Sequence, residues 1–294
     1  MAWILTPMTG PVVLPRSLDE TVDALRAAPD ATILAGGTDL MVAVNAGRHR
    51  PEAVVSLARV PELRSWHREG DELVLGACLT YTEMEHGELA TLVPALCQAA
   101  RTVGSPQIRN AATLGGNLGT ASPAGDTLPV LAALDAVVEV RGPAGGRAVP
   151  VLDFVTGVKK TALLPSELVT AVRLPVLRGP QEFLKVGTRN AMVISVVMAA
   201  LVVDLDGRTV RLGLGSVAPV PVRAREAEAY AGDSVDWAGL EQGRARIEDP
   251  AVFARFGELA AEATAPIDDH RSTAAYRRHA VAVCARRALE RALG

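Results

Sequence analysis

Cysteine and histidine are too scarce in this chain to predict a metal centre. The three cysteines, Cys78, Cys97 and Cys284, lie far apart and form no Cys-x-x-Cys pair, and the five histidines share no metal-ligand spacing. Iron–sulfur clusters and structural zinc sites need several such ligands at short spacing. We therefore expect three reduced, mostly buried thiols and no metal bound by this chain.

Aromatic residues and surplus positive charge are missing as well. The chain has three Trp, three Tyr and four Phe, and its formal net charge is −3. A nucleic-acid surface needs a basic stripe or aromatic rings on which bases stack. The composition therefore argues against nucleic acid as a partner.

The sequence also lacks a hydrophobic run long enough for a bilayer. Its most apolar window, residues 192–203, is shorter than the ~20 residues that a membrane-spanning helix needs. Residues 1–7 lack the basic start and long apolar stretch that are typical of a signal peptide. We expect a soluble, cytoplasmic protein with no membrane span.

The sequence motifs of self-sufficient enzymes are absent. There is no Gly-x-Ser-x-Gly elbow, no His-Glu-x-x-His and no Walker lysine. The stretch 213–218 matches Gly-x-Gly-x-x-Ala, but Pro219 and Pro221 follow where a Rossmann fingerprint needs a helix. We therefore assign no catalytic residue and expect the chemistry to belong to a bound cofactor.

Two glycine-centred loops are the most informative feature that is present. Residues 35–40 read Ala-Gly-Gly-Thr-Asp-Leu after a strand-like apolar run, and residues 113–123 combine Gly115, Gly116 and Gly119 with small hydroxyl residues. Bare backbone beside hydroxyl groups can bring peptide N–H groups against a phosphate. Either loop alone could be a plain connection. Together they predict a dinucleotide with an extended pyrophosphate.

The residue types in and near these loops suggest roles. The amides of Gly36 to Leu40, with the Thr38 hydroxyl, are candidates for a pyrophosphate cradle. Asn117 and Thr120 offer directed hydrogen bonds. Asp126 could accept a hydrogen bond from a ribose hydroxyl or cap a helix over 127–134, and both interpretations stay open.

The apolar pattern predicts helices and strands in mixed order. At 294 residues the chain is long for one core, so we expect two or three subdomains. Strands are expected over 31–34, 53–57, 136–141, 148–152, 167–174, 182–187, 196–205 and 209–217, with helices over 18–27 (N-cap Ser17), 39–46 (starting at Asp39) and 273–293.

Two further expectations concern a loop and a helix face. Residues 104–125 show little periodicity, which predicts one long functional loop. The final helix is expected to turn Tyr276, His279, Val283 and Leu289 toward one face.

At this point the motifs resemble a known family. The stretches that carry the resemblance are residues 35–40, 108–136, 183–203, 214–228 and 272–289, in this order. They resemble the FAD-binding medium subunit of the molybdenum hydroxylases, the xanthine dehydrogenase and carbon monoxide dehydrogenase family.

The resemblance implies an α+β fold of two parts. Residues 1–176 would form a two-subdomain FAD-binding domain of the vanillyl-alcohol oxidase (PCMH) type, with subdomains at about 1–58 and 59–176. Residues 177–294 would form the C-terminal α+β flavoprotein domain of the carbon monoxide dehydrogenase type.

The resemblance also implies which residues contact the cofactor. Residues 33–40 would hold the pyrophosphate, Val103 and Gly104 would lie near the flavin, residues 113–117 would form a second wall, and Asp126 would bind ribose. Relatives often have an aromatic residue near the ring edge, and none can be placed in this sequence. The full predicted set, which includes Ile194 near the isoalloxazine and a basic Arg223 near the flavin, is Ile33, Leu34, Ala35, Gly36, Gly37, Thr38, Asp39, Leu40, Val103, Gly104, Thr113, Leu114, Gly115, Gly116, Asn117, Thr120, Ala121, Asp126, Ile194 and Arg223.

The function implied by the resemblance is electron transfer within an oxidoreductase complex. A large subunit would oxidise the substrate at a molybdenum cofactor. Electrons would pass through the [2Fe–2S] clusters of a small subunit to FAD on this chain and on to NAD, a quinone or O2. The FAD would be non-covalent, because no His or Cys lies within either loop, and a dimer of heterotrimers is the implied assembly.

Two other interpretations remain open at the level of sequence. One is a stand-alone flavin reductase or oxidase of the same fold, although no proton donor or substrate pocket can be identified. The other is a non-catalytic assembly subunit that has lost FAD, although the intact glycines of both loops favour binding.

Overall fold

The first subdomain is built on a small parallel sheet. The computed structural model describes residues 10–241 and 247–294, so residues 1–9, on which the signal-peptide argument rests, lie outside it. The strand order is β1 (Val12–Val13), β3 (Val54–Ser56) and β2 (Thr32–Leu34). Helix α1 (Leu18–Ala27) begins as predicted, because the Ser17 side chain accepts a hydrogen bond from the Glu20 N–H.

A second subdomain follows around a five-stranded antiparallel sheet. Strand β6 alternates between buried and more exposed residues because one of its faces covers a core, whereas β5 is buried at four successive positions. The sheet order is β4 (Trp66–Glu69), β5 (Glu72–Gly76), β10 (Leu168–Pro175), β6 (Val137–Gly142) and β7 (Gly145–Pro150). The other elements are 3-10 helices Leu57–Arg59 and Pro61–Leu63, helices α3 (Tyr81–Met84), α4 (Gly87–Leu92), α5 (Pro94–Arg101), α8 (Leu128–Ala133) and α9 (Val151–Phe154), and the β8 (Val155–Gly157) and β9 (Lys160–Thr161) hairpin.

The predicted long loop at 104–125 is wrong in its secondary structure. It contains two short helices, α6 (Pro106–Arg109) and α7 (Leu114–Thr120). Each begins at a capping hydroxyl: Ser105 accepts from the Ile108 N–H, and Thr113 accepts from the Gly116 N–H. Helices this short show no periodicity in a sequence, so only their caps could have predicted them.

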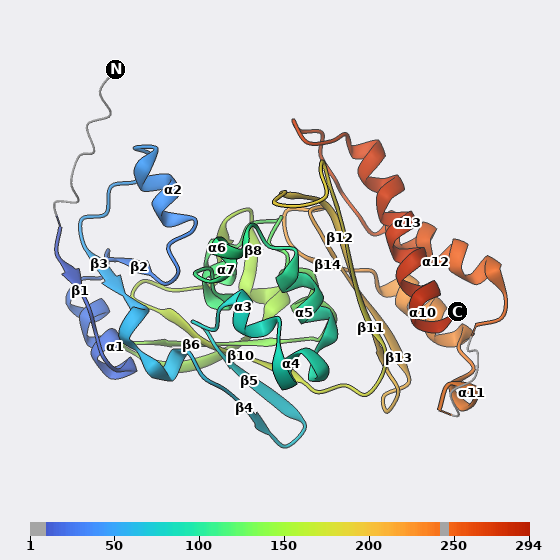
Figure 1. The fold of residues 1–294 in the computed structure, drawn as a ribbon, viewed down its shortest axis with the longest axis horizontal. Coiled ribbons are helices and arrows are strands. Elements are labelled where there is room, and N and C mark those ends of the chain that lie inside the picture. Colours follow the sequence, from blue (N-terminus) through green and yellow to red (C-terminus); the bar gives the residue numbers. More distant parts are fainter. Residues whose placement is uncertain (1–9, 242–246) are drawn as a thin grey trace.

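The sheet of the C-terminal domain packs against a hydrophobic core on each of its two faces. Figure 1 shows strands β11 to β14 standing between the green helices of the second subdomain and the red C-terminal helices. All ten residues of β12 are buried. Met198, Ala200 and Val202 join the core of the second subdomain, whereas Val197, Ala199 and Leu201 join the C-terminal core. The sheet is β11 (Gln181–Gly187), β12 (Ser195–Asp204), β13 (Thr209–Gly215) and β14 (Val222–Arg223), followed by α10 (Arg225–Ser234), α11 (Trp237–Glu241), α12 (Pro250–Glu262) and α13 (Ala274–Leu293).

Burial on both faces explains the most apolar window of the sequence. A strand covered on both sides has apolar residues at consecutive positions. Within the described ranges, no helix has the length and the apolar character needed to cross a membrane.

The predicted face of the last helix is right for Leu289, which is fully buried, but wrong for Tyr276 and His279. Thr273 caps α13, but Tyr276 and His279 are exposed, and the buried face carries Ala280, Val281 and Cys284. It also carries Arg277, which is buried because its guanidinium meets the backbone carbonyls of Val196 and Ser216. Cys78, Cys97 and Cys284 are all free and buried, as predicted.

Candidate functional site

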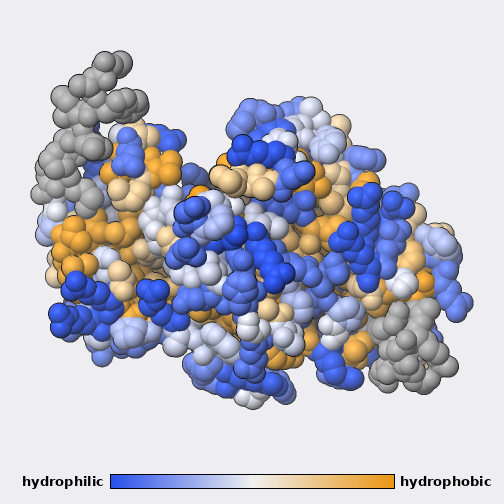
Figure 2. Space-filling model, in the orientation of Figure 1, coloured by the Kyte–Doolittle hydropathy of each residue, from blue (hydrophilic) through white to orange (hydrophobic). Residues whose placement is uncertain are grey.

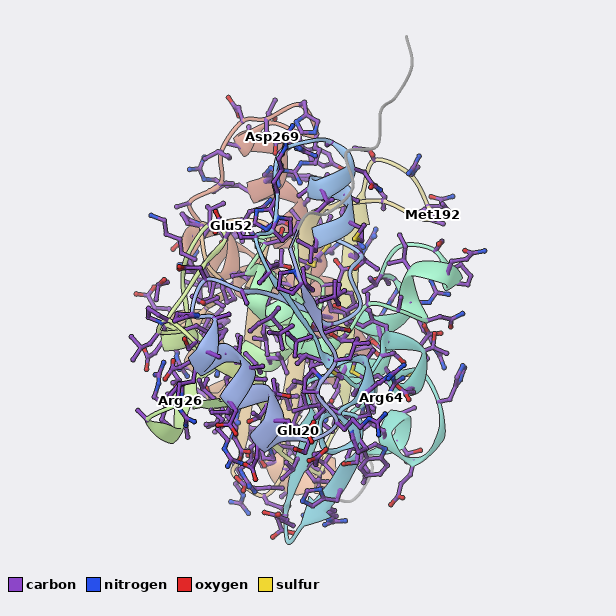
Figure 3. All side chains as sticks on the ribbon, turned by 90° about the vertical axis from the view of Figure 1, so that its left-hand side faces the viewer. Glu20, Arg26, Glu52, Arg64, Met192 and Asp269 are labelled. Atoms are coloured by element: carbon purple, nitrogen blue, oxygen red, sulfur yellow. The ribbon has the colours of Figure 1, made fainter. Side chains whose placement is uncertain are left out.

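The two glycine loops and the C-terminal domain line one cavity of about 700 Å³. Its size is within the range of small-molecule and cofactor sites. In the space-filling view the outline dips between the lobe that carries α2 (Leu40–Asn45) and the C-terminal lobe (Figure 2). Met192 lies on this side, at the opposite end of the molecule from Glu20 of α1 (Figure 3). The predicted residues that line the cavity are Ile33, Leu34, Ala35, Gly36, Gly37, Thr38, Asp39, Leu40, Val103, Gly104, Thr113, Gly115, Gly116, Asn117, Thr120, Asp126 and Ile194.

Three predicted residues lie elsewhere. Leu114 belongs to the hydrophobic core of the second subdomain. Ala121 ends α7 in the left-handed conformation and is also buried in that core. Arg223 is 4% exposed and forms ion pairs with Glu228 and Asp135. These bonds hold Arg223 in the C-terminal domain, outside the lining of the cavity.

The first loop presents unused backbone donors. In the part of the chain that the structure describes, the N–H groups of Gly36, Gly37, Thr38 and Asp39 have no hydrogen-bond acceptor. Gly37 has a φ of +72°, a conformation that favours glycine. The four consecutive N–H groups can therefore donate to a ligand.

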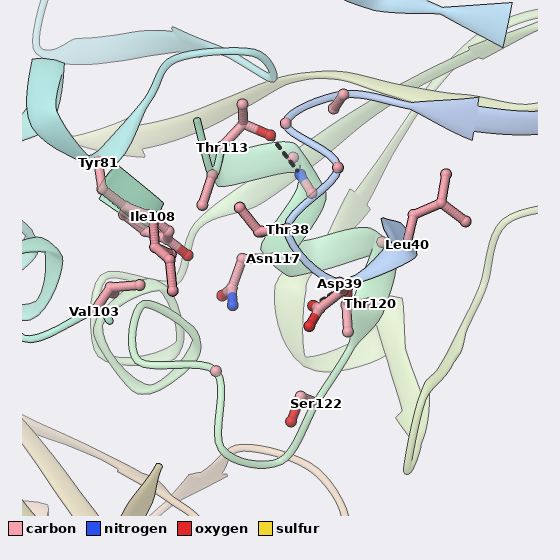
Figure 4. Close-up of a pocket in the computed structure, with 18 of the residues that line it drawn as sticks. Thr38, Asp39, Leu40, Tyr81, Val103, Ile108, Thr113, Asn117, Thr120 and Ser122 are labelled. Carbon is pink, nitrogen blue, oxygen red and sulfur yellow. Dashed lines mark hydrogen bonds between the residues drawn. The ribbon is translucent and has the colours of Figure 1, made fainter. Parts of the chain in front are cut away.

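Asp39 does not cap the helix that it precedes. Its side chain makes no capping bond to α2. Instead, Asp39 Oδ2 accepts a hydrogen bond from Thr120 Oγ1 at 3.0 Å. This bond ties the first loop to the end of α7, and both residues lie together on one wall in Figure 4.

Each glycine loop packs closely against a neighbouring segment, the first against Ala111 and the second against Ala77. A Cβ added to Gly36 would lie 1.8 Å from the carbonyl oxygen of Ala111, and one added to Gly115 would lie 2.6 Å from Ala77 Cβ. These glycines are required by contacts within the protein as well as by any ligand. Thr113 Oγ1 accepts from Gly116 N at 3.0 Å, the dashed bond in Figure 4.

Asp126 is a buried carboxylate in which only one of the two oxygens accepts hydrogen bonds from described residues. Oδ2 accepts from Lys185 Nζ at 2.5 Å and from Thr102 Oγ1 at 3.1 Å. Within the described residues Oδ1 has no partner. Burial raises the pKa of Asp126, and the Lys185 charge opposes that rise.

The alternative role of Asp126 as a helix cap is wrong. Helix α8 starts after Thr127 with no side-chain capping bond. Thr127 donates to Asn117 Oδ1 at 2.7 Å, which leaves the amide N–H2 of Asn117 as a potential donor. Asp126 Oδ1 is therefore a potential acceptor in a cavity whose loops supply donors.

Lys185 and Tyr81 are among the lining residues that the sequence did not predict. Lys185 is 8% exposed at its side chain, in β11 of the C-terminal domain. A lysine inside an apolar strand is a detectable signal, because lysine is seldom buried without a partner. Tyr81, at the start of α3, is an aromatic residue in the lining, and its burial raises its pKa.

One cysteine also lines the cavity. Burial raises the pKa of the Cys78 thiol to about 11, so it is protonated at neutral pH. A protonated thiol is a poor nucleophile. Its position does not favour a covalent bond to a ligand.

The fold and the cavity are those of a cofactor-binding protein. Two family models together match most of the chain. Residues 7–177 match the model for the FAD binding domain in molybdopterin dehydrogenase, and residues 182–292 match the CO dehydrogenase flavoprotein C-terminal domain. The chain belongs to the FAD-binding subunits of the molybdenum hydroxylase family. It is an oxidoreductase subunit with the two-subdomain FAD-binding fold and a C-terminal α+β domain.

Individual relatives match between 73% and 95% of the chain. The chain is 33% identical to the carbon monoxide dehydrogenase medium chain of Afipia carboxidovorans, covering 95% of this chain and 94% of that one. It is also 33% identical to the xanthine dehydrogenase FAD-binding subunit of Escherichia coli O157:H7, covering 73% and 76%.

Solved structures agree with the fold. Reconstituted CO dehydrogenase from Oligotropha carboxidovorans matches with a TM-score of 0.86 at 30% identity, covering 97% of this chain and 98% of that one. Quinoline 2-oxidoreductase from Pseudomonas putida 86 matches with a TM-score of 0.87 at 26% identity, covering 99% and 98%.

Proposed function

We propose that this chain is the electron-transfer subunit of a multi-subunit molybdenum hydroxylase that acts in the cytoplasm. It receives electrons from the [2Fe–2S] clusters of a small partner subunit and passes them to an external acceptor. The substrate is oxidised on a large partner subunit that carries the molybdenum cofactor. The chain holds its FAD non-covalently.

The observation that carries this proposal is the complementary chemistry of the cavity. The first loop supplies four free amides, from Gly36 to Asp39. Asp126 supplies a hydrogen-bond acceptor instead, because its Oδ1 is buried and has no partner among the described residues. A pyrophosphate needs donors and a ribose hydroxyl needs an acceptor, so both needs of a dinucleotide are met.

The cavity also has an apolar part that suits a ring system. Val103, Ile108 and Ile194 line it together with Tyr81. We assign the flavin ring to these residues and the pyrophosphate to residues 33–40. Bound FAD supplies one- and two-electron redox chemistry, and the chain's residues bind and orient it. The proposed contacts omit Leu114, Ala121 and Arg223.

The proposed partners follow from the relatives. Two of them are named as medium chains of carbon monoxide dehydrogenase, and a matching solved structure is a Cu,Mo-CO dehydrogenase. We extend this arrangement to the present chain, with one large and one small partner subunit. A dimer of such heterotrimers is the proposed assembly.

Purification of the complex from the native host through a tag on this chain tests the proposal. We expect two co-purifying subunits, with molybdenum, iron and FAD in the complex. A matched complex that carries Gly116→Val should keep its metals and still reduce its clusters with substrate, but fail to reduce the external acceptor. Purification of the chain alone with full substrate turnover would instead support a stand-alone flavin enzyme.

A further inference from the structure

The turn between α5 and α6 contributes backbone to the cavity. Val103 and Gly104 both line it, and Gly104 has a φ of +45°. A Cβ at Gly104 would lie 2.9 Å from Ile108 Cγ2, so glycine is required for space as well as for conformation. The N–H of Gly104 meets no acceptor in the described part of the chain.

The carbonyl groups of this turn are held by one side chain. Arg109 Nη1 donates to the carbonyl oxygen of Val103 at 3.2 Å and to that of Gly104 at 3.4 Å. The described peptide bonds are all trans. In a trans peptide the C=O and N–H groups point in opposite directions. The Gly104 N–H therefore lies on the face of the turn away from the guanidinium.

That face is the cavity side. Val103 and Gly104 belong to the lining, and Arg109 does not. The turn thus separates the guanidinium from the cavity. An acceptor atom of a ligand can reach the Gly104 N–H, whereas the two carbonyl oxygens point away from the ligand.

Arg109 is itself fixed by a carboxylate. Its Nε lies 2.5 Å from Glu85 Oε1, and the side chains are 17% and 11% exposed. Nη1 of the planar guanidinium donates to both carbonyls, while Nε forms a close ion pair with Glu85, whose Oε1 accepts no hydrogen bond from any described residue. A lysine has one charged nitrogen and cannot reproduce this fork.

We infer that Arg109 is a positioning residue for the flavin end of the cavity, an inference that rests on the proposed FAD site. Arg109 does not touch the ligand. It holds the turn so that the Gly104 N–H is presented to an oxygen acceptor of the flavin ring. Without it, the Gly104 peptide can rotate and bring a carbonyl oxygen toward the same acceptor, which repels it.

The test compares three variants of the full-length chain loaded with FAD. Arg109→Met removes the fork, and Arg109→Lys keeps the charge beside Glu85. The matched control is Arg101→Met, because Arg101 Nη2 also reaches Glu85, at its backbone oxygen, but contacts neither carbonyl of the turn. The readouts are the FAD dissociation constant and the visible circular dichroism of the bound flavin.

Both Arg109 variants should bind FAD about tenfold more weakly, the equivalent of one lost charge-assisted hydrogen bond. Both should also alter the visible circular dichroism, whereas Arg101→Met should change neither readout. If Arg109→Met fails to fold, Arg109→Lys against Arg101→Met decides. Unchanged affinity and spectrum in Arg109→Lys would overturn the inference while the wild-type chain still binds FAD. A wild-type chain that never binds FAD would overturn the proposed function.

Discussion

Lys185 and Asp126 form an ion pair across the boundary between the FAD-binding part and the C-terminal domain. Lys185 Nζ lies 2.5 Å from Asp126 Oδ2, and the side chains are 8% and 5% exposed. Lys185 also donates to the Thr102 carbonyl oxygen at 3.0 Å. The C-terminal domain thus fixes the carboxylate whose other oxygen, Oδ1, is buried and has no partner among the described residues.

Replacing Lys185 by Met should destabilise the chain strongly. Asp126 would remain buried with only the Thr102 hydroxyl as a partner, and removal of one member of a buried pair costs about 3 kcal/mol. Urea denaturation measures this loss. The same substitution in an Asp126→Asn background should cost much less, because no charge is left unpaired. Equal losses in the two backgrounds would contradict the pairing.

The Lys185→Met variant should also acquire a pH dependence of stability. Burial raises the pKa of Asp126 in the folded chain, and the loss of Lys185 removes the opposing charge. A raised folded pKa means that the folded chain holds the proton more tightly. Stability is therefore present below the ordinary carboxyl pKa of about 3.9 and is lost as the pH rises through the raised value. Unfolding curves at several pH values should show this loss, and a flat profile in Lys185→Met would count against it.

Replacing Gly116 by Val should weaken flavin binding and leave the fold intact. A first side-chain carbon at this position would lie 2.9 Å from Thr113 Oγ1, and a branched side chain extends further into the cavity. We expect FAD affinity to fall about tenfold or more. Gly232→Val in α10 is the control, since nothing lies within 4 Å of a Cβ there. Normal FAD occupancy in Gly116→Val would remove this loop from the site.

Asp269 should stabilise the C-terminal domain at neutral pH and lose this effect in acid. Burial opposes ionisation, but bonds from Arg271, Ser272 and Arg277 hold the pKa of Asp269 well below its usual range. A depressed folded pKa gives stability that is present above the ordinary carboxyl pKa and is lost as the pH falls toward the folded value.

Asp269→Asn should therefore cost about 2 kcal/mol at neutral pH, and the difference from the wild type should shrink as the pH falls below the ordinary carboxyl pKa of about 3.9 toward the folded value. Thermal unfolding at several pH values checks this. Asp71→Asn removes a carboxylate that is 98% exposed and should show no comparable loss. A constant difference between Asp269→Asn and wild type at all pH values would contradict the assigned contribution.

The sequence predicted features that depend on local signals. Ser17 begins its helix as expected, because a capping hydroxyl acts within a single turn. The two glycine loops, which were predicted to serve one ligand, both line the same cavity. The predicted strands over 136–141 and 148–152 and the predicted C-terminal strands are present with shifts of a few residues at their ends.

The features that depend on distant partners could not be predicted in the same way. Lys185 is expected at the surface until Asp126 is placed beside it. Arg277 is buried because the carbonyls of Val196 and Ser216 and the carboxylate of Asp269 accept hydrogen bonds from its guanidinium. Arg223 was assigned by resemblance alone, and its bonds to Glu228 hold it elsewhere.

The visible absorption spectrum of the purified full-length chain tests the central claim most directly. Heat release and identification of the bound molecule complete the measurement. The proposal predicts flavin bands and the release of FAD without proteolysis, as expected for a non-covalent cofactor. A chain that stays colourless after incubation with FAD, and that stays colourless when co-expressed with its partner subunits, would contradict it.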